Sequence, residues 1–118
     1  MNREIKFKFW CTSENRFVTG ISIHGNGEIS CPDDISGTDI CKDVIPLQYT
    51  GCKDCSGKEI YEGDIVKFIN WSDEPNREII FIDGTFTYKN TFYDWDGLLY
   101  TEKCVIVGNI FENSDLIK

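Results

Sequence analysis

Apolar residues occupy every second position from Ile5 to Phe9, and lysines fill the positions between them. A period of two is typical of a half-buried β-strand, so we predict a strand over residues 4–10. Phe17 to Ile23 is a second β-prone run. The polar residues 13–16 interrupt the two runs, which predicts a hairpin at the start of the chain.

The pattern is irregular over residues 24–44, where glycines, a proline and four aspartates supply turn residues and little periodicity. We expect mostly loop there, with one or two short strands. No Ser/Gly-rich or Pro-rich linker follows at Pro46. We therefore expect a single domain over residues 1–118, in which an N-terminal region (1–45) and a barrel-like region (46–118) share one core.

The second half contains a clear hairpin signal. Residues 79–82 and 85–88 are β-prone and flank Asp83-Gly84, a dipeptide that tolerates the positive φ angles of a two-residue turn. Within residues 60–69, a strand is expected from Asp64 to Ile69, entered through a turn at Glu62-Gly63.

Further along, Asp96-Gly97 predicts a turn, and strands are expected near 98–101 and 103–110. Asn113 to Asp115 could cap one last helical turn. No segment of helical length shows apolar residues at i, i+3, i+4 and i+7. The predicted fold is therefore mainly β: an N-terminal hairpin and irregular region joined to a small SH3-like barrel or strongly bent sheet, with short helices at most.

The net charge of the chain limits the classes of partner that it can bind. The 118 residues carry a formal net charge of -8, of which -2 falls in residues 1–59 and -6 in residues 60–118. Nucleic-acid affinity comes mainly from lysine and arginine, so a general nucleic-acid binder is not expected. A basic N-terminal strip formed by Arg3, Lys6 and Lys8, with Trp10, leaves a nucleic-acid-associated role open as an alternative. The acidic second half leaves DNA mimicry open as another.

The first ten residues place charges between their apolar side chains and do not resemble a signal peptide, and no apolar run reaches the length of a membrane span. We therefore expect a protein that stays in the cytoplasm where it is made, with no membrane partner. Its six cysteines should then be reduced.

Cys52-Lys53-Asp54-Cys55 followed by Ser56-Gly57 has the form of a zinc knuckle, in which a tight turn directs two thiolates at one ion. Structural zinc needs four ligands, and the remaining candidates include no second Cys-x-x-Cys pair: Cys11, Cys31, Cys41, Cys104 and His24. We expect no metal and no other cofactor. If a metal binds, Cys52 and Cys55 are its ligands.

Motifs for catalysis are missing. Asp94-x-Asp96 begins like a calcium loop but lacks the closing glutamate, so we interpret it as a hairpin turn with solvated acids. His24 is the only histidine, and the sequence has no nucleophile elbow, phosphate-binding loop or His-Glu-x-x-His helix. We do not expect an enzyme.

Aromatic residues are abundant for so small a core, and aromatic side chains are favoured at protein interfaces. The candidates are Trp10, Tyr49, Tyr61, Trp71, Phe92, Tyr93, Trp95 and Tyr100. Each has an alternative reading as a core residue.

The segment from Leu47 to Val66, with Leu47-Gln48-Tyr49-Thr50-Gly51 and Gly57-Lys58-Glu59-Ile60-Tyr61-Glu62-Gly63-Asp64-Ile65-Val66, resembles the central signature of the YopX family of bacteriophage and prophage proteins. The opening Arg3 to Trp10 and the closing Val107 to Asn113 resemble the family's two ends, which leaves residues 22–44 and 70–100 as variable parts. The resemblance implies a mainly β protein with a barrel-like second half and a phage-encoded accessory role. It implies no reaction, and it implies other residues at positions 52 and 55.

The leading hypothesis is accordingly a non-enzymatic protein-interaction module that binds a phage or host protein or a second copy of itself. The candidate binding residues are Tyr61, Glu62, Asp64, Trp10 and Tyr49. The alternative reading of Glu62-Gly63-Asp64 is structural: a glycine suited to positive φ and an aspartate that bonds to nearby backbone would simply turn the chain.

Overall fold

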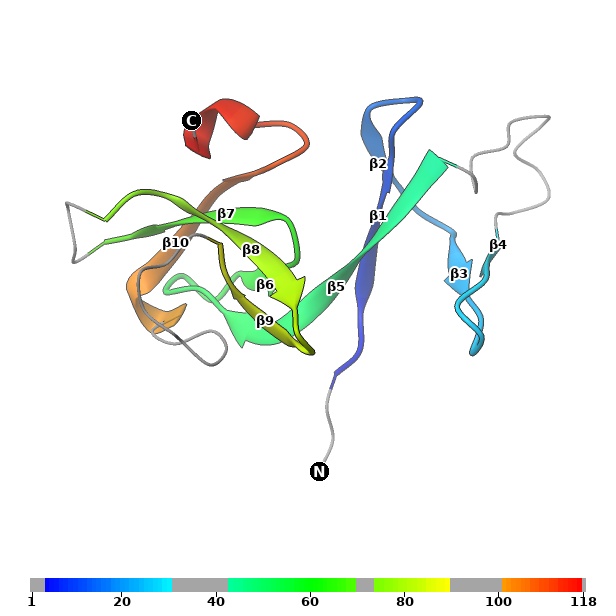
Figure 1. Cartoon of the computed structure of the whole chain (residues 1–118), viewed down its shortest axis with the longest axis horizontal. Helices are drawn as coiled ribbons and strands as arrows, with labels where there is room; N and C mark the ends of the chain where they lie inside the picture. The colour runs from blue at the N-terminus through cyan, green and yellow to red at the C-terminus, as the bar shows by residue number, and fades with distance from the viewer. Residues whose placement is uncertain (1–3, 31–42, 70–73, 90–100, 118) are drawn as a thin grey trace. The chain divides into compact units, whose positions relative to one another are not determined.

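A computed structural model describes residues 4–30, 43–69, 74–89 and 101–117. The chain divides into two compact units, which are described separately. Unit 1 comprises Met1–Lys6 and Gln48–Lys118, and unit 2 comprises Phe7–Leu47. Unit 2 is therefore an insertion in the sequence of unit 1 (Figure 1).

Unit 2 contains two small antiparallel pairs. Strand β1 (Phe7–Cys11) pairs with β2 (Arg16–Val18), and β3 (Ser22–Ile23) pairs with β4 (Ile29–Ser30). The residues packed in this unit form one cluster of buried and partly buried side chains: Cys11, Val18, Val44, Phe9 and Ile21.

The N-terminal hairpin is confirmed, but the second run is not one strand. The predicted run from Phe17 to Ile23 is broken between β2 and β3 at Gly20, whose φ is 78°. Few residues other than glycine adopt that backbone conformation readily, so the chain turns there. Strand β4 is one of the short strands expected in residues 24–44, and residues 31–42 lie outside the described part.

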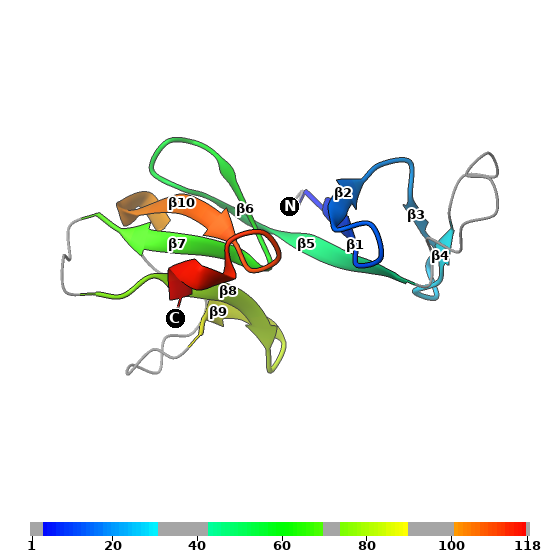
Figure 2. The same ribbon diagram turned by 90° about the horizontal axis from the view of Figure 1, so that it is seen from above.

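Strand β5 (Val44–Lys53) begins in unit 2 and ends in unit 1. The other strands of unit 1 are β6 (Glu59–Tyr61), β7 (Asp64–Phe68), β8 (Arg77–Ile82), β9 (Thr85–Tyr88) and β10 (Cys104–Asn109). β5 pairs with β6, and the second sheet has the order β10-β7-β8-β9 (Figures 1 and 2). Two 3-10 helices are short: η2 (Thr101–Lys103) and η3 (Ser114–Ile117).

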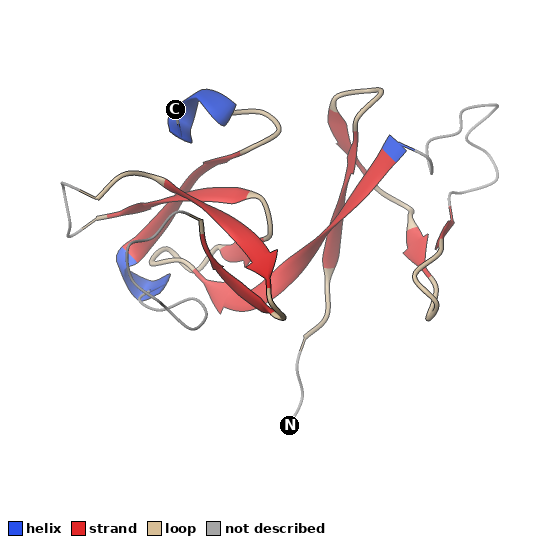
Figure 3. Cartoon of the chain, viewed as in Figure 1, coloured by secondary structure: helices blue, strands red, loops and turns tan. Residues whose placement is uncertain are grey.

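All six strands of unit 1 contribute to a single core. Its cluster contains Cys52 from β5, Ile60 from β6, Val66 and Phe68 from β7, Ile79 from β8, Tyr88 from β9, and Cys104 and Ile106 from β10. Burying these side chains from two sheets in one cluster is how a barrel or a strongly bent sheet stabilises itself. The mainly β fold, with short helices only, is confirmed for the described residues (Figure 3).

Several local predictions are confirmed in unit 1. β8 and β9 form the hairpin whose turn is Asp83-Gly84, with φ angles of 52° and 81°. Gly63 turns the chain between β6 and β7 with a φ of 88°. η3 is the last helical turn expected after Asn113.

Other predictions lie outside the described residues or differ from the structure. The predicted turn at Asp96-Gly97 and residues 98–100 of a predicted strand lie outside the described residues, and Thr101 begins η2 instead of ending a strand. The sequence did not predict β5 as a strand of ten residues. The chain divides into two compact units, and a core shared between them stays a prediction. Within the described ranges, no helix has the length and apolar character needed to cross a membrane.

Candidate functional site

In the turn between β6 and β7, the Asp64 side chain and the Gly63 backbone form hydrogen bonds within unit 1. The Asp64 carboxylate accepts a hydrogen bond from the Tyr61 backbone N–H at 2.8 Å. Gly63 donates its N–H to the Ile79 carbonyl at 2.8 Å and accepts from the Ile110 N–H at 2.9 Å. Asp64 is buried. These contacts support the structural reading of Gly63 and Asp64, and a binding role for Asp64 stays a prediction.

Tyr49 and Tyr61 lie side by side across β5 and β6, with ring centroids 5.5 Å apart. Both side chains are buried. Lys6 lies over the Tyr49 ring at 5.5 Å and forms ion pairs with Glu59 at 2.5 Å and Glu4 at 3.0 Å. The structure thus brings two predicted site residues together with three charged residues that the sequence did not assign to them.

Electrostatics around this group are dominated by carboxylates. Hydrogen bonds to Glu59 and Glu4 raise the pKa of Lys6, and the hydrogen bond from Lys6 lowers the pKa of Glu59. Burial, followed by the charges of Glu59 and Glu4, raises the pKa of Tyr49 despite the nearby Lys6. Tyr49 is therefore a neutral phenol at physiological pH, in a locally negative field.

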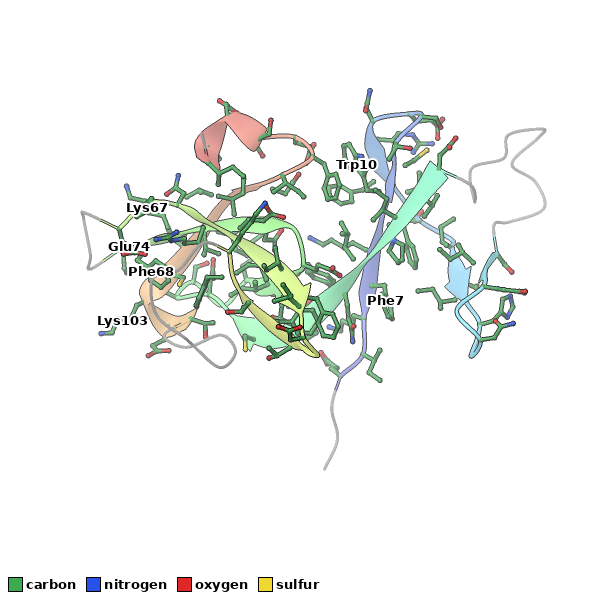
Figure 4. The ribbon with its side chains drawn as sticks, in the orientation of Figure 1. Phe7, Trp10, Lys67, Phe68, Glu74 and Lys103 are labelled. Carbon is green, nitrogen blue, oxygen red and sulfur yellow. The ribbon has the colours of Figure 1, made fainter. Side chains whose placement is uncertain are left out.

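The remaining predicted residues are placed differently. Glu62 is partly buried, and its carboxylate accepts a hydrogen bond from the Gln48 N–H at 3.3 Å. Trp10 is a residue of β1 in unit 2, where Figure 4 also shows Phe7. Trp10 is buried and makes an edge contact with Phe17 at 4.9 Å between centroids. Trp10 thus belongs to unit 2, whereas the other four predicted residues belong to unit 1.

Next to Tyr49 the surface of unit 1 is hollowed over about 270 Å³. We call this hollow the Tyr49 groove. It is lined by the N-terminal segment, β5 and the β8–β9 hairpin, through Glu4, Gln48, Tyr49, Thr50, Gly51, Phe81, Gly84, Thr85 and Phe86.

Phe81 and Phe86 are the aromatic side chains of the hairpin in this groove. They are partners in the register of β8 and β9, and their ring centroids are 4.9 Å apart. Phe81 is 51% exposed, a large fraction for a phenylalanine. Neither residue was predicted as a site residue from the sequence, although two phenylalanines placed symmetrically about a two-residue turn indicate a cross-strand aromatic pair.

The two cysteines of the Cys-x-x-Cys segment have different surroundings. Cys52 is part of β5 and packs against the core of unit 1, whereas Cys55 is exposed. The intervening Asp54 is buried. Among the described residues, no group of three or more histidine, cysteine, aspartate or glutamate side chains converges as a metal site would require.

Asp54 is instead a structural hub. One carboxylate oxygen accepts hydrogen bonds from the Ser56 N–H at 2.9 Å, the Ser56 hydroxyl at 2.7 Å and the Lys58 N–H at 2.9 Å, and the other accepts from the Ile106 N–H at 3.0 Å. Burial alone would raise the pKa of Asp54, but these donors, Ile106 foremost, lower it. Asp54 therefore fastens the turn after β5 to β10.

Unit 2 has a hollow of its own. It measures about 490 Å³ and is lined mainly by apolar side chains of β1 and β2, including Phe7, Phe9 and Phe17, with Lys8 at 5.8 Å from the Phe17 ring centre. It lacks the carboxylates that accompany the Tyr49 groove.

Solved structures of two bacterial proteins are similar to the chain. Protein EF1440 from Enterococcus faecalis matches with a TM-score of 0.71 and 24% identity, over 99% of this chain and all (100%) of that one. YopX from Bacillus subtilis matches with a TM-score of 0.59 and 20% identity, over 95% of this chain and 97% of that one. No curated protein matches the chain. The family model described as YopX protein matches residues 6–118, and the chain therefore belongs to the YopX family.

Proposed function

We propose that the chain is a non-enzymatic protein-interaction module of phage or prophage origin, which works in the bacterial cytoplasm and binds its partner through the Tyr49 groove. The observation that carries this proposal is the half-exposed Phe81, which lines the same groove as the buried Tyr49. Aromatic side chains at the edge of a hollow are typical anchors of protein interfaces.

The chemistry of the groove supports binding rather than catalysis. Among the described residues that line it, the ionisable groups are Glu4 and Tyr49, and no histidine, cysteine or lysine is present. The Thr50 hydroxyl donates a hydrogen bond to the Ile60 carbonyl at 2.8 Å. A groove of this composition offers contact area and polarity but no activated nucleophile.

Nucleic-acid binding has less support. Of the basic strip, Arg3 lies outside the described residues, and Lys6 is already paired with two carboxylates. Phosphate contacts would have to displace Glu4 and Glu59 from Lys6, at a cost in affinity.

DNA mimicry is also weakened, because several acids of the second half are used within the fold. Asp64 is buried and hydrogen-bonded. Glu74 pairs with Arg77 at 2.9 Å, and Glu78 lies 3.7 Å from Lys89. Acids engaged in this way do not form a row of free charges that could imitate phosphates.

Site-specific photo-crosslinking tests the proposal in the bacterial cell. The photoreactive residue p-benzoylphenylalanine would replace Phe81 in one variant and Ile69 in the control, because both side chains are 51% exposed and Ile69 does not line the groove. We expect one bacterial or phage protein to crosslink from position 81 and not from position 69, and to bind the purified chain. Equal crosslinking from both positions, or none from position 81, would contradict the proposal.

A further inference from the structure

The aromatic content of the Tyr49 groove suits a cation. The Tyr49 ring already has the Lys6 ammonium group 5.5 Å from its centre. Phe81 and Phe86 add two more rings, packed against one another at the hairpin. The faces of such rings attract ammonium and guanidinium groups, and their surfaces cover the aliphatic stems of lysine and arginine.

The charges around the groove are negative, which suits a positively charged side chain. Glu4 lines it, and Asp83 immediately precedes the lining residue Gly84 in the turn. Lys6 shares its single charge between Glu4 and Glu59, so these three residues together keep one negative charge. The raised pKa of Tyr49, caused first by burial and then by Glu59 and Glu4, is consistent with a negative local field.

Unit 1 as a whole also carries a negative net charge. Its sequence contains fourteen acidic and nine basic residues, a formal charge of -5. Such a field attracts basic segments during encounter and repels nucleic acid.

The volume of the Tyr49 groove limits the kind of ligand that it can hold. The groove of about 270 Å³ is smaller than the roughly 300–1,000 Å³ typical of sites for whole small molecules. It is suited to one or two side chains.

From these observations we infer that the Tyr49 groove receives an arginine or lysine side chain from a basic, partly apolar segment of a partner protein, between the rings of Tyr49, Phe81 and Phe86 and the carboxylate of Glu4. This inference rests on the proposed function, because it specifies the partner of the same groove.

A random peptide library tests the partner chemistry without knowledge of the natural partner. The whole chain would be the bait, and Phe81→Ser would be the bait for counter-selection. We expect the retained peptides to be enriched in arginine or lysine next to an aliphatic or aromatic residue. A synthetic peptide from the selection should bind about threefold to tenfold more weakly to Glu4→Gln and to Phe81→Ser, the loss expected for an exposed charge contact or a cation–π contact.

Two matched variants separate the groove from the general negative field. Glu102→Gln removes one exposed acid on η2, and Ile69→Ser removes one equally exposed apolar side chain on β7's C-terminal side; neither residue lines the groove. Both should bind the peptide as the unaltered chain does. Circular dichroism melting curves of all four variants would show that each is folded.

The inference is overturned if the selected peptides are acidic or uncharged, or if all four variants bind the basic peptide equally. It is also overturned if spermidine displaces the peptide completely when both are present at the same concentration of positive charge. If position 81 crosslinks a partner that lacks a basic segment at the contact, the proposed function stands and this inference falls. If position 81 crosslinks nothing while the basic peptide binds the groove, the recognition chemistry stands and the cellular function falls.

Discussion

Asp54 shows how one buried side chain can fix a long turn. Its four hydrogen bonds join Ser56 and Lys58, in the turn after β5, to Ile106 in β10. A buried carboxylate without such donors would be costly, whereas one that accepts several of them is held in its charged form.

Asp54→Asn should therefore destabilise unit 1. If the amide oxygen keeps the bonds to Ser56 and Lys58, the amide NH₂ faces the Ile106 N–H, so that two donors meet. We expect a loss of about 2–3 kcal/mol in the free energy of unfolding, measured by denaturant titration. Asp83→Asn, which removes the same charge from an exposed turn, is the control and should change stability little. An equal loss of unfolding free energy in both variants would show that the change in net charge, and not the loss of the Asp54 hydrogen bonds, is responsible.

The contribution of Asp54 should depend on pH. Because its pKa is lowered in the folded chain, the stabilisation is complete above the ordinary aspartate pKa of about 3.9 and is lost as pH falls through the lower folded value. The difference in melting temperature between the unaltered chain and Asp54→Asn should accordingly narrow only below about pH 4. A difference that already disappears between pH 5 and 7 would contradict this assignment.

Cysteine reactivity provides a second test at the residue scale. Cys104 is buried beside the Tyr88 hydroxyl at 3.6 Å, and burial raises the pKa of its thiol to about 11. Cys55 is exposed. Because the thiolate is the reactive form, iodoacetamide at pH 8 should modify Cys55 in the native protein and Cys104 only after denaturation. Peptide mapping by mass spectrometry measures this, and early modification of Cys104 would show that the core of unit 1 opens readily.

The hairpin of β8 and β9 is the element that presents Phe81 to the groove. Its turn places Asp83 and Gly84 in the left-handed region, with φ angles of 52° and 81°. A Cβ atom added at Gly84 would meet nothing within 4 Å, so any cost of substitution there comes from the backbone and not from a clash.

Gly84→Ala should then cost about 1 kcal/mol in unfolding free energy. Gly84→Asn should cost less at the same position, because asparagine tolerates the left-handed region. Thermal melts of the two variants measure the difference. Equal losses would mean that side-chain volume, and not φ, is decisive at this turn.

Local patterns were sufficient to predict this hairpin and the turn at Gly63, since turn chemistry lies in adjacent residues. They were insufficient for β5, which contains Pro46 and Gly51, two residue types that are uncommon inside strands. Gly51, with a φ of 88°, lies within an irregularity in the β5–β6 register between Tyr49 and Lys53. A bulge of this kind depends on the partner strand, which the local sequence does not specify.

The candidate site was predictable only in part for the same reason. Tyr49 and Tyr61 were singled out by their type and by the family resemblance, and the structure pairs them. Glu4 and Phe81 line the groove beside Tyr49 although they lie far from it in sequence. Their contribution follows from tertiary folding, so no pattern within a short window could have predicted it. The Cys-x-x-Cys spacing likewise did not reveal that Cys52 packs against the core of unit 1.

At the scale of the molecule, unit 2 is inserted between Lys6 and Gln48 of unit 1. The two ends of unit 1 that flank this insertion lie side by side, because the Tyr49 N–H donates a hydrogen bond to the Lys6 carbonyl at 2.8 Å. Unit 1 also has a hydrophobic cluster of its own. A short connection between Lys6 and Gln48 could therefore replace residues 7–47 without stretching the chain.

We predict that a variant with residues 7–47 replaced by a short glycine-rich linker folds cooperatively. Its unfolding in urea should be a single transition, and its amide NMR spectrum should be dispersed as in a β protein. If this variant is unfolded while the full chain is stable, unit 1 depends on unit 2, and the single shared core expected from the sequence would be the better description.

The central claim is that a YopX-family chain binds a protein through the Tyr49 groove, and the affinity of the crosslinked partner tests it most directly. Isothermal titration calorimetry would compare the unaltered chain with Phe81→Ser and with the equally exposed control Ile69→Ser. We predict that Phe81→Ser weakens binding by about tenfold or more, as expected for loss of an aromatic anchor. Ile69→Ser should leave the affinity unchanged. Unaltered affinity in Phe81→Ser, with both variants folded, would contradict the account.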